Sequence, residues 1–435
     1  MSKRSVLSAV MAVGLVLAVP RTASAAKPMD AKFKAAAAGL APELIAVRRD
    51  IHAHPELGFQ EKRTAGIVAA WFEKLGLEVR TGIGGTGVLG VLRGGKPGPV
   101  VMMRGDMDAL PIAEETPVPF ASKEKAVVDG RECGLMHACG HDIHTTLLLG
   151  TASVLAGFRK DLPGIVLFVA QPAEEITDSG AAAMIADGVF RDIKPEAAFA
   201  YHVDDTLKTG FIHYARGWAS ANCDEFTLDI KSEGCHGADP DACVDPIVVG
   251  ARIVTDLQVM IARQLDVRDD TVITVGAFHA GSASNIIPRE ARLKATIRTY
   301  GENHRALVKA KIERLIEKAC AAWGADYALD YRYGTPARYD DPALVDEILP
   351  TAERVLGGKD RLLEAAPEMG GEDFSYFARL VPAAMLNLGV VPEEVAGTSV
   401  HSPTFIADED AIPLGVALMS AVIWDHQHRK PSGRE

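Results

Sequence analysis

Two short segments of this sequence combine residue types that bind divalent metal ions. Cys139 and His141 flank a glycine at the start of a predicted helix, and Glu174 and Glu175 follow the apolar run 165–170. The positive end of a helix favours a thiolate and a neutral imidazole, which are the forms that bind metal. Two adjacent carboxylates beside a buried strand are costly unless a positive charge compensates them. We therefore expect metal chemistry at both segments.

The two adjacent carboxylates are expected to have different tasks. Because neighbouring residues cannot both point at one atom, one of Glu174 and Glu175 is predicted to bind metal. The other is predicted to act as a general base on a water molecule.

Two histidines follow other predicted strands, where they can join these segments. His202 ends the predicted strand 197–202, and His401 follows the predicted strand 383–389. Open α/β sheets bind ligands beyond the carboxyl ends of their strands, so these side chains are expected to converge. Packing alone does not require polar residues at successive strand ends. The predicted metal ligands are Cys139, His141, Glu175, His202 and His401, which suit zinc or a similar divalent ion and are numerous enough for two ions.

The elements that must position these residues alternate between strands and helices. Predicted strands near 100–103, 165–170 and 197–202 alternate with helical patterns, and the alternation resumes later with a strand at 383–389 and a helix at 411–424. Such alternation predicts an α/β fold with a parallel central sheet.

Between these halves the predicted order changes to β-α-β-β-α-β. That order is typical of a ferredoxin-like module, and such a module can be inserted at an exposed loop of a larger domain. A chain of 435 residues is also long enough for two domains. The expected division is a leader at 1–25, a first domain in two parts at 26–215 and 335–435, and an inserted domain at 216–334.

Composition and charge restrict the partners of this chain. Hydrophobic residues make up 48% and charged residues 24% of the sequence, which is the profile of a globular enzyme. The formal net charge is −12, so neither nucleic acid nor an anionic membrane surface is an expected partner.

The first 25 residues have the pattern of a secretory signal. Lys3 and Arg4 precede an apolar run at 6–19, and small residues end the segment at Ala25. The alternative, a membrane anchor, needs about 20 apolar residues, and this run is shorter. We expect cleavage near Ala25, no stable membrane anchor, and an exported protein that is periplasmic or secreted.

Taken together, the polar segments resemble the M20 metallopeptidases, in particular the amidohydrolase branch of hippurate, N-acyl amino acid and auxin-conjugate hydrolases. The resemblance covers nearly the whole chain after the leader. The matching segments are RDIHAHPELG (49–58), RGDMDALP (104–111), HACGHD (137–142), QPAEE (171–175), GEDF (371–374) and HSPTF (401–405). The resemblance implies a zinc-peptidase-like catalytic domain and an inserted lid domain through which the enzyme forms a homodimer.

The same resemblance implies roles for particular residues. Cys139 would bridge two divalent ions (zinc, manganese, cobalt or nickel), and Glu174 would be the general base. The reaction would be hydrolysis of the amide bond of N-acyl or N-aroyl amino acids, or of a short peptide. Three further residues, Asp106, Asp108 and Glu372, are expected to orient the ligands.

Positions that contact substrate in this family correspond to His236, Asn285 and Arg298. These residue types suit the reaction, because a developing oxyanion needs a hydrogen-bond donor and a free carboxylate needs a cation. His236 would take the first role and Arg298 the second, and the family's dimers lend such residues to the partner's active site.

One position departs from the branch: Asp241 stands where a second histidine is common. A carboxylate there would repel acidic substrates or attract cationic ones, or it would have no role in a solvated loop. Nearby, Cys235 and Cys243 are close enough in sequence to form a disulfide, although sequence alone does not fix the pairing.

Two alternatives to the amidohydrolase stay open. A dipeptidase or carboxypeptidase of the same fold would differ only in its substrate pocket. A periplasmic binding protein that had lost its chemistry would be expected to lack the base or several ligands, and all of these are present here.

Overall fold

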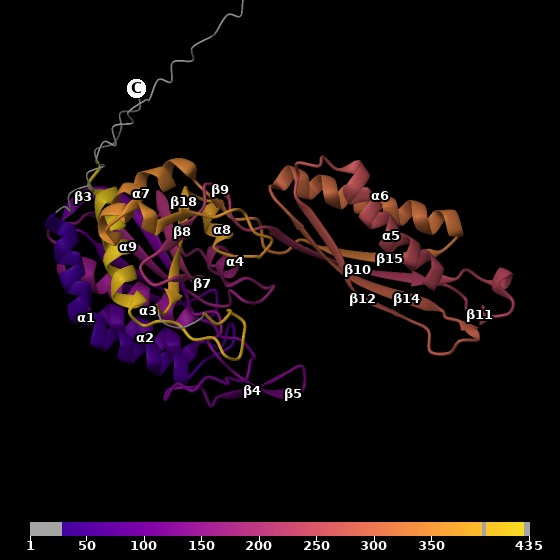
Figure 1. Cartoon of the computed structure of the whole chain (residues 1–435), viewed down its shortest axis with the longest axis horizontal. Coiled ribbons are helices and arrows are strands. Elements are labelled where there is room, and N and C mark those ends of the chain that lie inside the picture. Colours follow the sequence, from indigo (N-terminus) through magenta and orange to yellow (C-terminus); the bar gives the residue numbers. More distant parts are fainter. Residues whose placement is uncertain (1–27, 394–396, 430–435) are drawn as a thin grey trace, which may run out of the picture.

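The computed structural model describes residues 28–393 and 397–429, and a mixed eight-stranded sheet forms the centre of its larger body (Figure 1). The strand order is β1-β2-β6-β3-β7-β18-β8-β17. The four central strands β6, β3, β7 and β18 are parallel, while β1, β2 and β8 join their inner neighbours antiparallel. The strands are β1 (Glu78–Ile83), β2 (Gly87–Arg93), β3 (Lys96–Asp106), β6 (Pro163–Gln171), β7 (Ala197–Lys208), β8 (Ile212–Tyr214), β17 (Leu362–Glu364) and β18 (Ala383–Val391). The predicted mostly parallel α/β sheet is therefore confirmed.

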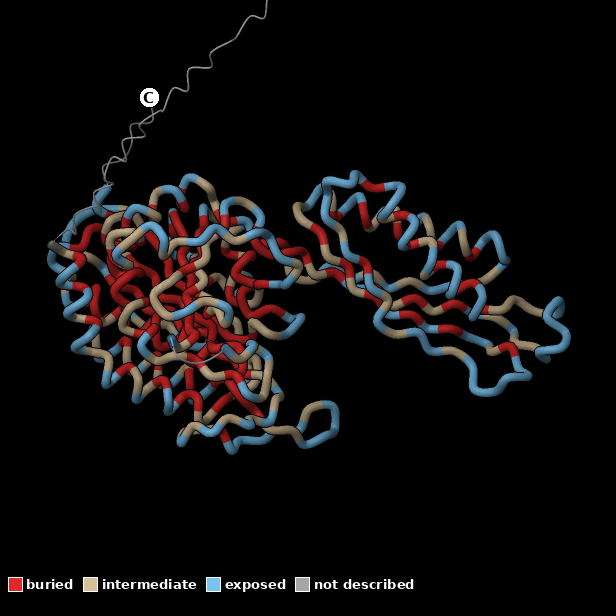
Figure 2. Tube along the Cα trace, in the orientation of Figure 1, coloured by how far each residue is buried: buried red, intermediate tan, exposed pale blue. Residues whose placement is uncertain are grey.

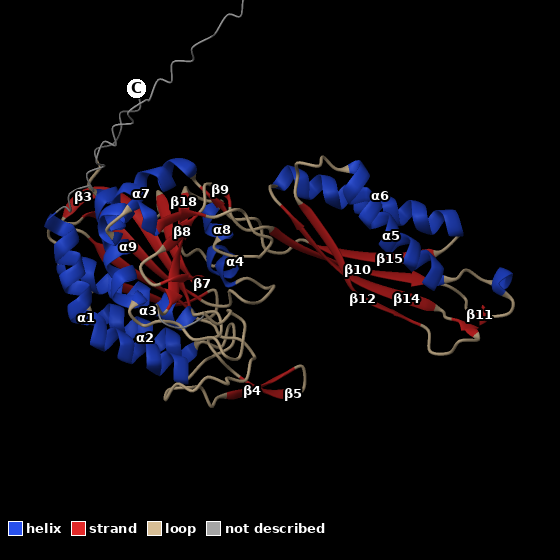
Figure 3. Cartoon of the chain, in the orientation of Figure 1, coloured by secondary structure: helices blue, strands red, loops and turns tan. Residues whose placement is uncertain are grey.

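Helices cover both faces of this sheet (Figure 3). Helices α1, α2, α3, α7 and α9 pack on one face, and the short α4 and α8 pack on the other. Strands covered on both faces need apolar side chains in both directions, which explains the continuous apolar run in β6. The helices are α1 (Pro28–Ala53), α2 (Lys62–Lys74), α3 (His141–Gly157), α4 (Gly180–Ala186), α7 (Pro342–Leu356), α8 (Ser375–Ala378) and α9 (Ala411–Gln427).

Helix α1 spans 26 residues, Pro28–Ala53, and contains a proline in its interior. Pro42 argues against a helix in this region, yet it lies inside α1. Phe33, Ala37, Leu44 and Ile51 are buried along one side of the helix, which packs against α3 and α9. Tertiary burial therefore outweighs the unfavourable local signal.

A second body is built from a four-stranded antiparallel sheet in the order β12-β14-β10-β15, with α5 and α6 on one face (Figure 1). Its elements follow the predicted β-α-β-β-α-β order, and Figure 2 shows that it has a buried core of its own. They are β10 (Asn222–Lys231), α5 (Pro246–Gln264), β12 (Thr271–Ala280), β14 (Glu290–Thr299), α6 (Glu302–Trp323) and β15 (Asp326–Arg332). The exact domain bounds at 215 and 334 stay a prediction.

Short elements complete the two bodies. The connections between the bodies pair with each other through β9 (Gly217–Trp218) and β16 (Tyr339–Asp340). At the far end of the second body, β11 (Cys235–His236) pairs with β13 (Ile286–Ile287), and a 3-10 turn follows at Pro240–Ala242. The hairpin of β4 (Lys125–Val128) and β5 (Arg131–Gly134) lies at the surface of the first body (Figure 1). In the turn Lys359–Arg361 and in β17, every residue is exposed or partly exposed.

The expected leader, residues 1–25, lies outside the described residues. Across residues 28–393 and 397–429, no helix is long and apolar enough to cross a bilayer.

Candidate metal centre

The five side chains predicted to bind metal meet at one edge of the central sheet. Cys139 Sγ lies 3.5 Å from His202 Nε2 and 3.2 Å from His401 Nε2. Glu175 Oε1 lies 3.2 Å from His401 Nε2 and 3.9 Å from His141 Nε2. The structure thus brings together residues that are as far as 262 positions apart in the sequence.

Cys139 and His141 are presented by a tight turn directly before α3. Gly140 caps this helix with φ of 78°, a backbone conformation that glycine adopts without strain. A Cβ atom on Gly140 would lie 2.7 Å from a methyl group of Val203, the residue after His202. The glycine therefore allows the turn to approach β7 closely enough for Cys139 to meet His202.

Hydrogen bonds orient two of the imidazoles so that Nε2 faces the cluster. His141 Nδ1 donates to the backbone carbonyl of Asp108, at 2.9 Å, and lies 3.2 Å from its carboxylate. His202 Nδ1 donates to the carbonyl of Val203 at 2.7 Å. The Asp108 carboxylate also accepts from the backbone N–H of Glu175 at 3.0 Å. Such contacts fix the tautomer and direction of a metal-binding histidine.

The donor atoms form two triplets that share Cys139. Cys139, His141 and His202 make one triplet, and Cys139, Glu175 and His401 make the other, each with its atoms within 4.8 Å. His141 Nε2 is buried and reaches no hydrogen-bond acceptor in the described residues, since the Asp106 and Glu175 carboxylates lie 3.8 and 3.9 Å away. Sulfur, nitrogen and oxygen donors arranged in this way fit a pair of borderline divalent ions.

Glu174 and Glu175 differ in their electrostatic surroundings. Burial raises the pKa of Glu174 well above its usual range, and the nearby Glu372, Asp373 and Glu175 add to the shift. Burial would also raise the pKa of Glu175, but the hydrogen bond from His401 and the charge of His141 hold it below its ordinary value. The two adjacent carboxyl groups are therefore shifted in opposite directions, with the pKa of Glu174 raised and that of Glu175 lowered.

A buried network of charged residues lies beside the candidate metal donors. The guanidinium of Arg104 is fully buried and pairs with Asp106, Glu372 and Asp373. Gln171, the last residue of β6, accepts from Arg104 at 2.8 Å and thereby joins the strand to the network. Asp106 and Glu372 thus hold Arg104, whereas Asp108 touches the donors directly.

His144 belongs to this network, although the sequence analysis did not select it. Its Nδ1 donates to Asp106 at 2.7 Å, and its Nε2 accepts from the backbone N–H of Val203 at 2.8 Å. Both ring nitrogens are therefore engaged, and burial lowers the pKa of His144 to about 4. Its position three residues after His141 on α3 places both rings on one helix face, which is the signal that could have found it.

Backbone strain occurs at two residues of the centre. Ala173 and His401 have φ of 51° and 59°, which is uncommon for residues other than glycine. The backbone N–H of His401 donates to the carbonyl of Ala138 at 2.8 Å, next to Cys139. The strained turn therefore holds His401 beside Cys139, and strain of this kind is common at functional sites.

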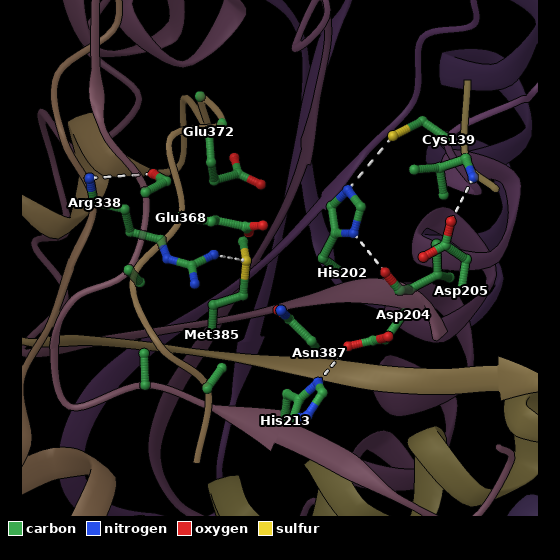
Figure 4. Close-up of a pocket in the computed structure, with 18 of the residues that line it drawn as sticks. Cys139, His202, Asp204, Asp205, His213, Arg338, Glu368, Glu372, Met385 and Asn387 are labelled. Atoms are coloured by element: carbon green, nitrogen blue, oxygen red, sulfur yellow. Dashed lines mark hydrogen bonds and ion pairs between the residues drawn. The ribbon is translucent and has the colours of Figure 1, made fainter. Parts of the chain in front are cut away.

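A cavity of about 500 Å³ opens onto the donors (Figure 4). Cys139, Glu174, Glu175, His202 and His401 form one part of its wall. The rest contains polar residues that the sequence analysis missed, namely Asp204, Asp205, His213, Ser220, Arg338, Glu368 and Asn387. No local motif marks these residues, because they come from strands and loops that precede and follow the second body in the sequence.

The three predicted substrate-contacting residues are not brought together. His236 and Asn285 lie side by side at the far end of the second body, where the N–H of Gly237 donates to the carbonyl of Asn285 at 2.8 Å (Figure 1). Arg298 lies near the other end of β14, and its Nη1 would be 4.0 Å from a Cβ on Gly371, which lines the cavity. Of the three, only Arg298 is near the cavity of its own chain.

The loop that carries His236 is closed by a disulfide between Cys235 and Cys243, whose Cα atoms are 5.9 Å apart. The pairing that the sequence left open is thus present in the structure. Asp241 is exposed within this loop.

A cysteine, three histidines and two glutamates at the edge of an α/β sheet define a metal-dependent hydrolase as the class of protein. Comparisons with known proteins extend this. Residues 102–425 match Peptidase family M20/M25/M40. The chain is 35% identical to N-acetylcysteine deacetylase of Bacillus subtilis, over 85% of this chain and 93% of that protein. It is also 35% identical to thermostable carboxypeptidase 1 of Saccharolobus solfataricus, over 87% of this chain and 94% of that one.

The structure agrees with these similarities. It superposes on the YXEP protein of Bacillus subtilis, a dinuclear metal binding peptidase of the M20 family, with a TM-score of 0.76 at 32% identity, covering 89% of this chain and 98% of that chain. The chain belongs to Peptidase family M20/M25/M40. It is a hydrolase of amide bonds that uses two metal ions.

The comparisons correct the prediction of export. The names of the relatives reported above, such as N-acetylcysteine deacetylase, give no indication of export, and nothing else in the comparisons shows that this chain is exported. The leader-like pattern at 1–25 resembled a signal because a basic pair precedes an apolar run, but that pattern alone does not establish secretion.

Proposed function

We propose that this chain hydrolyses the amide bond of N-acyl amino acids, with Glu174 as the general base beside a two-ion centre. The ions would be held by the five donors around Cys139. The shared position of Cys139 in both donor triplets is the observation that supports this arrangement most directly. When bound, the ions supply Lewis acidity, which acidifies a water molecule and polarises the scissile carbonyl.

Glu174 is the residue that would transfer the proton of the attacking water. Glu174 lines the cavity next to the donors, and its carboxylate lies within 4.8 Å of the donor atoms of His141 and Glu175. From there it can accept a proton from the attacking water and return it to the leaving nitrogen. Its neighbours Glu372 and Asp373 favour the protonated form after the first transfer, because like charges crowd the site.

The proposed enzyme works as a homodimer in which the second body reaches the partner's cavity. His236 is exposed at the far end of that body and does not line the cavity of its own chain, as far as the described residues show. Its ring would stabilise the developing oxyanion of the partner's substrate, with Asn285 beside it. Arg298, at the rim of its own chain's cavity, would attract a substrate carboxylate.

A substrate panel tests the proposed function. N-acetyl, N-benzoyl and dipeptide forms of one amino acid would be incubated with purified protein and, in parallel, with zinc, manganese, cobalt or nickel. The N-acyl compounds are expected to be cleaved faster than the dipeptide. Faster cleavage of the dipeptide would favour a peptidase, and no cleavage with any metal would contradict the proposal.

The role of Cys139 leads to a prediction about metal content. Cys139→Ala is expected to lower both bound metal and activity, because the thiolate belongs to both triplets. Elemental analysis of the purified variant measures the first effect. Cys133→Ala, in the exposed β5 hairpin, is the matched control and should keep wild-type metal content. Full metal occupancy in Cys139→Ala would show that Cys139 is only a small packed residue.

A further inference from the structure

We propose that Arg338 binds a carboxylate of the substrate inside the catalytic cavity, an inference that rests on the proposed function. Among the described residues that line the cavity, Arg338 is the only lysine or arginine. Six carboxylic residues share the wall with it: Glu174, Glu175, Asp204, Asp205, Glu368 and Glu372. Away from the metal donors, an anionic group of a substrate therefore has one favourable place in this cavity.

The guanidinium of Arg338 is nearly buried, yet few hydrogen-bond acceptors of the described residues lie near it. The residue is 6% exposed. Its Nη1 donates to the thioether sulfur of Met385, a weak acceptor. Its Nε lies 3.4 Å from a carboxylate oxygen of Asp340 and makes no hydrogen bond within the described part of the chain. A carboxylate that replaced the sulfur would gain charge-assisted hydrogen bonds, which are about twice as strong as neutral ones.

Asp340 compensates the positive charge of the nearly buried Arg338. The aspartate is fully buried on β16 and pairs with the Nε side of the guanidinium. This contact holds the planar group and leaves its outer N–H groups directed to the cavity wall formed by Met385 (Figure 4). Preorganisation of this kind reduces the cost of ordering a side chain when a ligand binds.

Strand β18 connects this subsite to the metal donors. Met385 and Asn387 are two residues apart on β18, so their side chains share one face, and Asn387 is paired with His202 of β7. Two residues of a strand span roughly 7 Å, which is the scale of a small N-acyl amino acid. Figure 4 shows Arg338 on the opposite side of the cavity from Cys139 and His202.

Asn387 contributes a second polar atom without a hydrogen-bond partner in the described part of the chain, on the strand that links Arg338 to the metal donors. Its Oδ1 is buried and has no hydrogen-bond partner in the described residues. A buried unsatisfied acceptor at a cavity wall is costly unless a ligand or water meets it. A substrate with its amide bond at the donors and a carboxylate at Arg338 would pass this atom, which could accept from an N–H of the substrate.

The carboxylate has two chemical sources, which an experiment separates. It is either the α-carboxylate of the amino acid or a second carboxylate at the end of the acyl group. Three probes distinguish them: N-acetylalanine has only the first, N-succinyl-alaninamide has only the second, and N-acetylalaninamide has neither. The variants are Arg338→Met and Arg338→Lys, with Arg216→Met as the control, since Arg216 pairs with Asp346 and Glu364 outside the cavity.

The wild type is expected to cleave one carboxylate probe about 10- to 100-fold more efficiently than the neutral probe. Arg338→Met should remove that preference, mainly through KM, and keep the bound metal, because Arg338 does not belong to the metal donors. Arg338→Lys should restore part of it, because a lysine keeps the charge but not the fork of donors. The probe whose advantage disappears identifies the source of the carboxylate.

A binding measurement gives a readout besides turnover. The preferred probe should bind to Glu174→Gln about 10- to 100-fold more tightly, by calorimetry, than to Glu174→Gln with Arg338→Met. Because Arg338→Met leaves buried Asp340 unpaired, the variant with Asp340→Asn added checks that any loss is not due to unfolding. An unchanged preference in both variants, or no preference in the wild type, overturns the inference while the proposed function stands. If the wild type cleaves none of the acyl compounds, both fail together.

Discussion

Glu174→Gln is expected to keep the fold and the bound metal but to lose about 10²- to 10⁴-fold of turnover, the usual contribution of a general base. The glutamine has nearly the same shape and can occupy the same wall of the cavity, but it cannot accept a proton from water. Glu174 is also the member of the carboxylate pair whose pKa is raised, whereas the pKa of Glu175 is lowered by the hydrogen bond from His401 and the charge of His141.

Steady-state kinetics and metal analysis on the same preparation check this prediction. Glu175→Gln provides the contrast, because loss of a donor should lower metal content as well as turnover. Glu364→Gln, at an exposed position of β17, is a control for the loss of one negative charge. Turnover near that of the wild type in Glu174→Gln would remove Glu174 from the mechanism.

The candidate metal donors could be selected from sequence because short-range chemistry marks them. A glycine between Cys139 and His141, and two carboxylates directly after an apolar strand, are unusual in a packed core, and each pattern lies within a few residues. His202 was found for a partly mistaken reason, since β7 does not end there but continues to Lys208. The strand continues because β18 pairs with it as far as Val391.

The far wall of the cavity could not be predicted in the same way. Arg338 has no neighbours in the sequence that suggest a site, and its importance comes from burial beside Asp340 and contact with Met385 of β18. Sequence reasoning assigned a substrate carboxylate to Arg298, which lies at the rim of the cavity, and that assignment stays a prediction. Local patterns can indicate candidate metal donors, while the shape of a pocket depends on segments that meet only in the folded chain.

His236 presents a related problem, because its predicted role needs a second subunit. In the structure it lies at the far end of the second body, beside Asn285 and inside the loop closed by the disulfide. Two explanations are possible: the body moves as a lid over its own cavity, or it serves the cavity of a partner. The strongest test of the dimer mechanism separates these explanations.

Mixing two inactive variants, His236→Ala and Glu174→Gln, is expected to restore activity if subunits exchange. In a mixed dimer with His236 acting on the partner, one site has both defects and the other has neither. Equal amounts that exchange freely give mixed dimers in half of the molecules, so about a quarter of the wild-type activity should return. Oxyanion stabilisation by one donor is worth about 10²- to 10³-fold, so the recovery would be large against either variant alone.

The matched control mixes Cys139→Ala with Glu174→Gln. Both residues line the cavity of one chain, so every site in a mixed dimer keeps one defect and no activity should return. Exchange itself is measured with two affinity tags or with subunits of different mass. If exchange is demonstrated and the His236→Ala mixture stays inactive, His236 does not act across the dimer, and the second body serves its own subunit by closing over it.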